Sequence, residues 1–136
     1  MAEGSKETPV VLGTNPKDLI GSNKVPLWLV PPAATIYTAL GFWDGAVKYG
    51  PYNWRKNKVL ATVYISALGR HLLDYLDGED NAQDSGYPHV AHMLACGAIL
   101  ADATETGNLV DDRPTKGAAA ALMARWDRSR KRGDTP

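Results

Sequence analysis

An acidic segment that follows a stretch of helical periodicity contains the residues best suited to chemistry. Its carboxylates are Asp74, Asp77, Glu79, Asp80 and Asp84. Arg70, Asp74 and Asp77 recur at i, i+4 and i+7, which puts them on one face of a helix. Hard divalent cations bind several oxygens, commonly shared between carboxylates, water and substrate phosphates. The segment therefore indicates a cation site, although a solvated helix end with an Arg70–Asp74 ion pair fits the same spacing.

Two histidines and the only cysteine form a second candidate group. His89, His92 and Cys96 are spaced i, i+3 and i+7, a pattern that can bind zinc on one helix face. No fourth zinc ligand is evident in the sequence. Because His89 and His92 fall in the first turns of an expected helix, where the dipole favours anions, they also suit contacts with phosphates. A hydrogen-bonded role in the core is the structural alternative.

Cations and aromatic residues alternate in the segment from Lys48 to Arg55. Trp54 can stack on a base, Asn53 can read a base edge, and Lys48 and Arg55 can hold phosphate. A packed turn between helices explains the same residues. A second basic segment, with Lys17 and Lys24, could close over a phosphate chain or act as a capping loop.

Composition and missing motifs narrow the class of protein. Fifteen basic residues balance 15 acidic residues, which argues against a stable complex with nucleic acid. One cysteine, no signal peptide and no apolar run long enough to span a membrane favour a cytoplasmic protein, in the host cytoplasm if a phage encodes it. Phosphate-binding glycine loops and nucleophile triads are absent. Metal-assisted hydrolysis is the remaining enzyme class that fits best.

Helical periodicity predicts an all-α domain over residues 13–128, between flexible tails at 1–12 and 129–136. The expected helices cover residues 32–49, 58–76, 86–106 and 118–128, with no strand. Ile36, Leu40, Trp43 and Val47 form the apolar stripe of the first helix. The arm at 13–32 is irregular because of its prolines, and its apolar residues 27–30 predict that it packs down on the domain.

Nine short motifs occur in one order over roughly residues 13–114. They are Asn15-Pro16-Lys17-Asp18, Pro31-Pro32, Gly45-Ala46, Lys48-Tyr49-Gly50, Asn53-Trp54-Arg55, Arg70-His71-Leu72, Gly78-Glu79-Asp80, Asp84-Ser85-Gly86 and His89-x-x-His92. In this order they resemble the phage dATP/dGTP diphosphohydrolases, short relatives of the MazG-like all-α nucleotide pyrophosphatases. The resemblance implies a bundle of about three main helices with a short C-terminal helix, assembled as a dimer or tetramer.

The resemblance also implies a reaction and a cofactor. The implied reaction releases pyrophosphate from a purine deoxynucleoside triphosphate, dGTP or dATP, with two or three Mg²⁺ or Mn²⁺ ions. In phages that use 2-aminoadenine, such an enzyme supplies dGMP for making that base. A catalytically silent nucleotide-binding or regulatory module of the same fold is the alternative, and a small helical adaptor with residues 86–106 as an oligomer interface is another.

The chain departs from the glutamate pattern of MazG-like enzymes, E-E-x-x-E and E-x-x-D on two helices. At those places it has His71-x-x-Asp74 and His89-x-x-His92. The resemblance therefore implies that Asp74, Glu79, Asp80 and Asp84 bind the metal, with Asp44 as a further candidate. It implies that Glu79 and Asp80 are catalytic. The residues expected to bind substrate are Lys17, Lys48, Asn53, Trp54, Arg55, Arg70, His71, His89 and His92.

Overall fold

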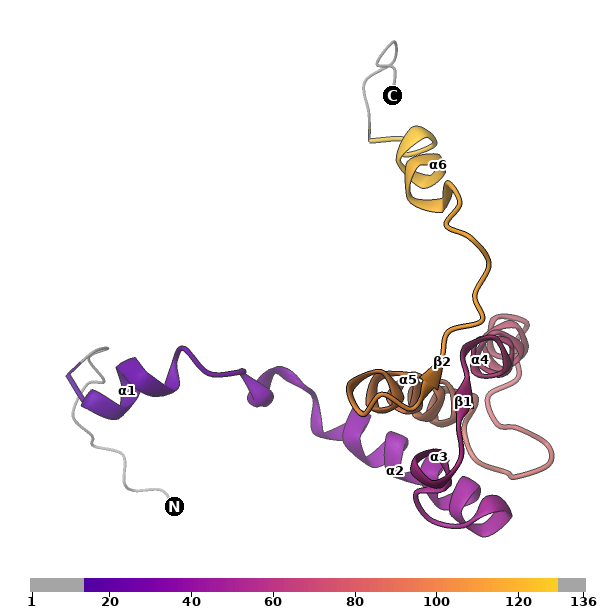
Figure 1. The fold of residues 1–136 in the computed structure, drawn as a ribbon, viewed down its shortest axis with the longest axis horizontal. Helices are drawn as coiled ribbons and strands as arrows, with labels where there is room; N and C mark the ends of the chain where they lie inside the picture. The colour runs from indigo at the N-terminus through magenta and orange to yellow at the C-terminus, as the bar shows by residue number, and fades with distance from the viewer. Residues whose placement is uncertain (1–13, 130–136) are drawn as a thin grey trace.

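Three helices form a bundle in the computed structural model, which describes residues 14–129. They are α2 (Pro32–Tyr49), α4 (Ala61–Leu76) and α5 (His89–Glu105), and α5 packs against both of the others. Figure 1 shows this bundle with a long extension at each end of the chain. The predicted all-α class is confirmed. None of the described helices has the length and apolar character needed to cross a membrane.

Small side chains let the three helices approach closely. The buried apolar residues among those described are Val59, Ala61, Ala82, Ala91, Ala95 and Ala103. Gly41 is buried in α2, where an added Cβ would lie 2.5 Å from the carbonyl oxygen of Ala91 and 2.7 Å from Cβ of Ala95. The α2–α5 contact therefore depends on glycine and alanine. His89 and Val59 are the largest fully buried side chains.

A two-stranded parallel sheet corrects the expectation that the chain has no strand. β1 (Val59–Leu60) pairs with β2 (Leu109–Val110), so that Val59 lies opposite Leu109. Each strand has only two residues, too short to show the alternation by which strands are recognised in sequence. The pairing brings Asp112 to the start of α4, where it accepts hydrogen bonds from the backbone N–H and hydroxyl of Thr62.

The predicted first helix, 32–49, agrees with α2, whereas the other three predicted helices are too long. α4 begins at Ala61 because residues 59–60 are in the strand, and α6 covers only Ala119–Arg125. α5 begins at His89, after Pro88, since the backbone of residues 80–88 forms a loop closed by the Asn81–Pro88 bridge. No side-chain hydrogen bond caps the N-terminus of α5.

The arm that precedes α2 extends away from the bundle (Figure 1), so the prediction that it packs down is wrong. It contains α1 (Pro16–Gly21) and a 3₁₀ turn (Leu27–Leu29), and neither has a buried residue. Pro31, in an extended conformation, connects the arm to the first residue of α2. The short α6 also lies away from the bundle. The predicted tails, 1–12 and 129–136, lie outside the described residues except for Ser129.

Candidate functional site

A cavity of about 410 Å³ opens between α2, α4 and α5. Its lining combines aromatic and small residues with a few polar groups at one side. The lining includes Asp44, Lys48, Asn53, Trp54, Tyr64, Arg70, His92 and Cys96, with Phe42 beside Trp54. Ligand sites are commonly concave and mostly apolar, with a few polar groups that fix orientation. The cavity therefore suits a small molecule that has one flat apolar part and one charged part.

The turn after α2 brings Asn53 and Trp54 to the cavity. Gly50 ends α2 with a φ of 91°, and Tyr52 takes the left-handed conformation with a φ of 56°. A positive φ is rare for a residue with a side chain as large as tyrosine. The reversal starts α3 (Asn53–Lys56), and the ring of Tyr52 stacks on that of Trp54 with centroids 4.9 Å apart.

Asp102 of α5 fixes the same turn from below. Its carboxylate accepts hydrogen bonds from Nε1 of Trp54 at 3.0 Å and from Nε and Nη2 of Arg55 at 2.9 and 2.7 Å. The Arg55 guanidinium holds the pKa of Asp102 below its usual range, and Trp54 adds to this effect. Bidentate pairs of this kind are among the stronger hydrogen bonds. Arg55 therefore orients Trp54 and lies outside the cavity lining.

Lys48 bridges two carboxylates at the polar side of the cavity. Its Nζ lies 3.0 Å from Oδ2 of Asp44 and 3.1 Å from Oδ2 of Asp84. Asp44 and then Asp84 raise the pKa of Lys48, and Lys48 in turn lowers the pKa of Asp84. The bridge ties α2 to the loop before α5. Asp84 is thereby paired with a cation, away from the other acidic residues of its loop.

Three histidines form a row that leads from the cavity to Glu79. His92 lines the cavity, and its ring stacks on His71 with centroids 4.6 Å apart. Nδ1 of His71 lies 2.8 Å from Nδ1 of His89, and Nε2 of His89 lies 2.6 Å from Oε1 of Glu79. Ser85 holds the other end of the row through a contact of 2.8 Å between its hydroxyl and Nε2 of His92.

Three groups of this row, Glu79, His71 and His92, have lowered pKa values. The hydrogen bond from His89, together with one from Gln83, lowers the pKa of Glu79, so Glu79 is a carboxylate that only accepts. Nε2 of His89 therefore donates to Glu79. Burial lowers the pKa of His71 and of His92, and the neighbouring histidines lower that of His71 further. The contact between the two Nδ1 atoms of His71 and His89 requires a proton on one of them.

Asp74, Glu79 and His89 are the one group of three metal-ligand types that converges within residues 14–129. One carboxylate oxygen from each acid and one ring nitrogen of His89 all lie within 4.8 Å of one another. Asp74 comes from the last turns of α4, Glu79 from the loop and His89 from the first residue of α5. Two carboxylates with one imidazole suit Mn²⁺ and also accept Mg²⁺. The donor set fits the cofactor that the sequence predicts.

The structure brings most of the predicted site residues together in two adjoining places. Five of the residues predicted to bind substrate line the cavity: Lys48, Asn53, Trp54, Arg70 and His92. The predicted metal ligands Asp74 and Glu79 lie at the far end of the histidine row. His71 and His89, predicted to bind substrate, form the row itself. No salt bridge joins Arg70 to Asp74 in the described residues, where five others are found.

Four predicted site residues lie apart from both places. Arg55 is bound to Asp102, outside the cavity lining. Lys17 is on α1, which Figure 1 shows far from the bundle. The side chain of Asp80 is exposed, and its backbone carbonyl accepts the N–H of His89. Asp84 is bound to Lys48. The zinc alternative gains no geometric support, because Cys96 belongs to no converging ligand group in residues 14–129.

Asp102 and Ser85 were missed as site residues. Both act through another residue, Asp102 by holding Trp54 and Arg55, and Ser85 by holding His92. Asp102 is 47 residues from Arg55, and no local pattern in the sequence joins them. Ser85 lies seven residues before His92, within the Asp84-Ser85-Gly86 motif. Only for Ser85 did a sequence signal exist.

Comparison with known proteins gives one match. Neither a curated protein nor a solved structure matches the chain. A family model described as dATP/dGTP diphosphohydrolase, N-terminal, matches residues 14–113. This range holds α1 to β2, and with them the cavity, the histidine row and the Asp74–Glu79–His89 group. The chain belongs to the family of dATP/dGTP diphosphohydrolase N-terminal domains.

Proposed function

We propose that the chain hydrolyses a purine deoxynucleoside triphosphate, dGTP or dATP, to the monophosphate and pyrophosphate with Mg²⁺ or Mn²⁺. The observation that carries this proposal is the histidine row. It joins a cavity with an aromatic wall to a group of metal-ligand residues, through His92, His71 and His89. A nucleotide has the same two parts, a flat base and a charged phosphate chain. The family name agrees with this substrate class.

The base would occupy the side of the cavity formed by Trp54, Phe42 and Tyr64. The rings of Phe42 and Trp54 lie 4.6 Å apart at the centroids, and Asp102 keeps Trp54 in place. An aromatic face stacks on any base, with a contribution of about 1–3 kcal/mol in nucleic-acid complexes. Asn53, beside Trp54, has an amide that can read a base edge. A purine base has a larger stacking surface than a pyrimidine base, which supports the proposed preference for dGTP or dATP.

The phosphates would lie toward Lys48, Arg70 and the histidine row. Asp74 and Glu79 would hold the cation, and His89 would join them where the cation replaces the proton on its Nε2. Two or three ions would recruit Asp44 or Asp84 as well. When bound, a divalent cation neutralises phosphate charge and lowers the pKa of a coordinated water. His71, whose pKa is lowered chiefly by burial, can act as the base that accepts a proton from the attacking water. Water is consumed, and the bond that joins the α and β phosphates is broken.

A hydrolysis assay on a panel of nucleoside triphosphates with Mn²⁺ tests the proposal. Release of pyrophosphate and monophosphate from dGTP or dATP is expected, and Glu79→Gln should lower kcat by at least 100-fold, on the order of a lost charge-stabilising group. Glu105→Gln, on an exposed residue at the end of α5, is the matched control and should keep wild-type activity. If the wild type turned over none of the nucleotides, the proposal that the chain is an enzyme would be refuted.

A silent nucleotide-binding module of the same fold remains the second candidate. The single glutamate at the site, Glu79, favours it, because MazG-like enzymes use several. In that case dGTP with Mn²⁺ would raise the melting temperature by mass action while no product forms. The combination of binding without turnover separates this candidate from the enzyme. A supply of dGMP for 2-aminoadenine would require turnover and is therefore part of the enzyme proposal only.

A further inference from the structure

The arm before α2 carries large apolar side chains that no other part of residues 14–129 covers. Leu27 is 75% exposed, Trp28 82% and Val25 78%, with Leu29 and Val30 also exposed. The arm nevertheless has defined local structure. Asn15 caps α1 by accepting the N–H of Lys17, and a 3₁₀ turn presents Leu27 to Leu29. Contiguous exposed apolar residues in an ordered segment indicate a contact with another molecule.

A second, apolar groove on the bundle has the shape and chemistry to receive this segment. It measures about 360 Å³ and lies along the outer face of α2 and the turn that follows. Its lining residues are Ala39, Phe42, Trp43, Ala46, Pro51, Tyr52 and Trp54. The predicted core stripe of α2 is also uncovered here, since Trp43 is 63% exposed and Val47 80%. None of the groove residues is charged, which matches the arm segment 25–30.

The groove adjoins the nucleotide cavity. Phe42 and Trp54 line both, so these two rings form the wall between them. Lys24 is four residues before Trp28, and a chain of four residues spans up to about 14 Å. An arm whose Trp28 sits in the groove can therefore place Lys24 at the cavity, with Lys17 farther along the same arm.

In one copy, most of the cations near the cavity are already paired with carboxylates, so few remain for a multiply charged phosphate chain. Lys48 already binds Asp44 and Asp84, and Arg55 is held by Asp102. Arg70 is the remaining cation among the described lining residues. The end of α4 and the loop after it add Asp74, Asp77, Glu79 and Asp80, whereas the arm offers two lysines beside one carboxylate, Asp18. The charges of arm and site are complementary.

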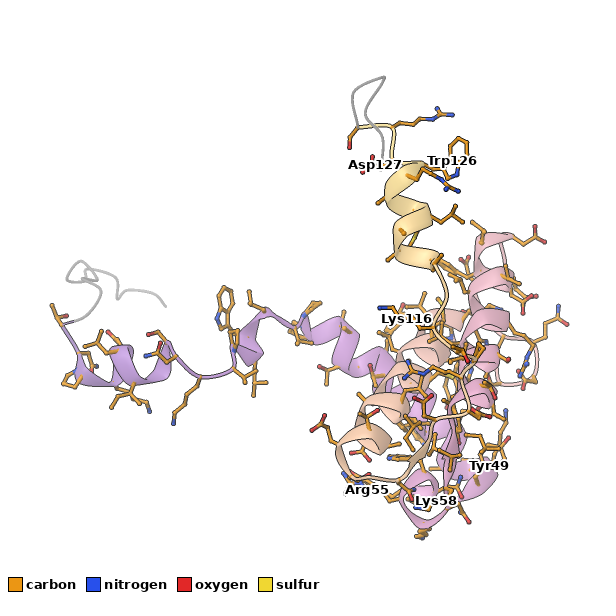
Figure 2. The ribbon with its side chains drawn as sticks, turned by 45° about the horizontal axis from the view of Figure 1, so that its top comes forward. Tyr49, Arg55, Lys58, Lys116, Trp126 and Asp127 are labelled. Carbon is orange, nitrogen blue, oxygen red and sulfur yellow. The ribbon has the colours of Figure 1, made fainter. Side chains whose placement is uncertain are left out.

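Trp28 cannot reach the far part of the groove of its own chain. Trp28 is joined to α2 by residues 29–31, and Pro31 directs the arm away from the helix (Figure 1). At 1.5 Å per residue, Ala39 lies about 10 Å and Ala46 about 21 Å along α2 from its first residue. Even on a fully reversed arm, Trp28 would reach about 14 Å back along α2, which is only the near part of the groove. Figure 2 shows the side chains of the arm projecting into open space.

We propose that the arm of one copy docks residues 25–30 in the α2 groove of a second copy and supplies Lys24 and Lys17 to that copy's nucleotide cavity. The docking rests on the uncovered arm and groove. The role of the lysines rests on the proposed function. The site is thus completed in trans, and each copy of a pair lends its arm to the other.

Complementation between two impaired chains tests the trans arrangement. Lys17→Ala/Lys24→Ala leaves the metal group intact but removes the arm's cations, and Glu79→Gln leaves the arm intact but disables the site. Each alone should show little activity. Coexpressed in equal amounts, they should regain about one quarter of wild-type activity, since half of the pairs are mixed and each mixed pair has one complete site.

Activity no greater than the sum of the two variants alone would overturn the proposal. Lys56→Ala/Lys58→Ala removes two exposed lysines from the bundle and serves as the matched control, which should retain wild-type activity. Should the lysine variant also retain it, the arm has no role in the site and the proposal fails.

The mass of the assembly tests docking without any catalysis, so its failure is distinguishable from that of the proposed function. Light scattering on the wild type should give at least twice the 14.7 kDa of one chain. Trp28→Asp in the arm and Ala39→Glu in the groove should each give single chains with unchanged helix content by circular dichroism. A wild type that is a single chain, or variants that keep the wild-type mass, would refute docking.

Discussion

Cys96 is the only cysteine in the chain, and its partly buried side chain lines the cavity between α2, α4 and α5. Burial raises the pKa of its thiol, an effect that Arg70 offsets in part. The thiolate is the reactive form, so a raised pKa slows reaction at neutral pH. We expect a thiol reagent such as DTNB to label native protein slowly at pH 8 and unfolded protein at the rate of a free thiol. The midpoint of the rate against pH should lie above about 8.5.

The same thiol reports on occupation of the cavity. A dGTP analogue with a methylene bridge between the α and β phosphates, added with Mn²⁺, should slow the labelling of Cys96 several-fold in native protein. In urea the analogue should have no effect, which controls for reaction with the reagent itself. Unchanged labelling at saturating analogue would place the nucleotide elsewhere.

At the scale of single residues, the sequence predicted residue types better than partners. A cation site was expected from the many carboxylates between residues 74 and 84, and two of them, Asp74 and Glu79, lie in the converging metal-ligand group. Asp84 has the same side-chain chemistry as Asp74, yet it pairs with Lys48, 36 residues away. Partners of this kind depend on how α2 meets the loop before α5. Sequence spacing within one helix carries no information about that contact.

Between elements, the closest contact is that of α2 with α5 at Gly41. An alanine there would bring its Cβ within 2.5 Å of a backbone oxygen, so the helices must separate. We expect Gly41→Ala to reduce the free energy of unfolding by about 1–3 kcal/mol, as overpacked cores do. Urea denaturation followed by circular dichroism measures this loss.

Gly45→Ala is the control, one turn farther along the same helix. Nothing lies within 4 Å of an added Cβ at Gly45. Alanine is better than glycine in a helix by about 0.5–1 kcal/mol, so this variant should be as stable as the wild type or more so. If Gly41→Ala were no less stable than Gly45→Ala, the close approach of α2 and α5 would not exist in solution.

The helices were predictable as elements because their periodicity and their proline and glycine boundaries are local. Pro32 and Gly50 bound the first helix in sequence as they do in the structure. The direction in which a helix faces was less predictable. The stripe of Ile36, Trp43 and Val47 was expected in the core, whereas the α5 contact uses Gly41. A glycine carries no hydrophobic signal, so periodicity assigns the face to the larger residues.

The whole molecule shows more apolar surface than a single copy can bury. Its buried apolar residues, among those described, are alanines apart from Val59, while Trp28, Trp43 and Trp126 are each more than 60% exposed. Figure 2 shows Trp126 on α6, well away from the bundle. The sequence contains enough hydrophobic residues for a core, but composition cannot tell whether they meet within one chain or between chains. In the proposed docking, association of two copies covers part of this apolar surface and thereby stabilises the fold.

Association makes stability depend on protein concentration, because mass action favours the folded assembly over unfolded chains. We expect the melting temperature of the wild type to rise by several degrees over a hundred-fold increase in concentration. Trp28→Asp should melt at a lower temperature that does not change with concentration, since its arm no longer covers the α2 groove. Lys116→Ala, on the linker before α6 (Figure 2), should behave as the wild type does. A wild-type melting temperature that is constant over this range would show that each chain is stable alone, with its arm uncovered.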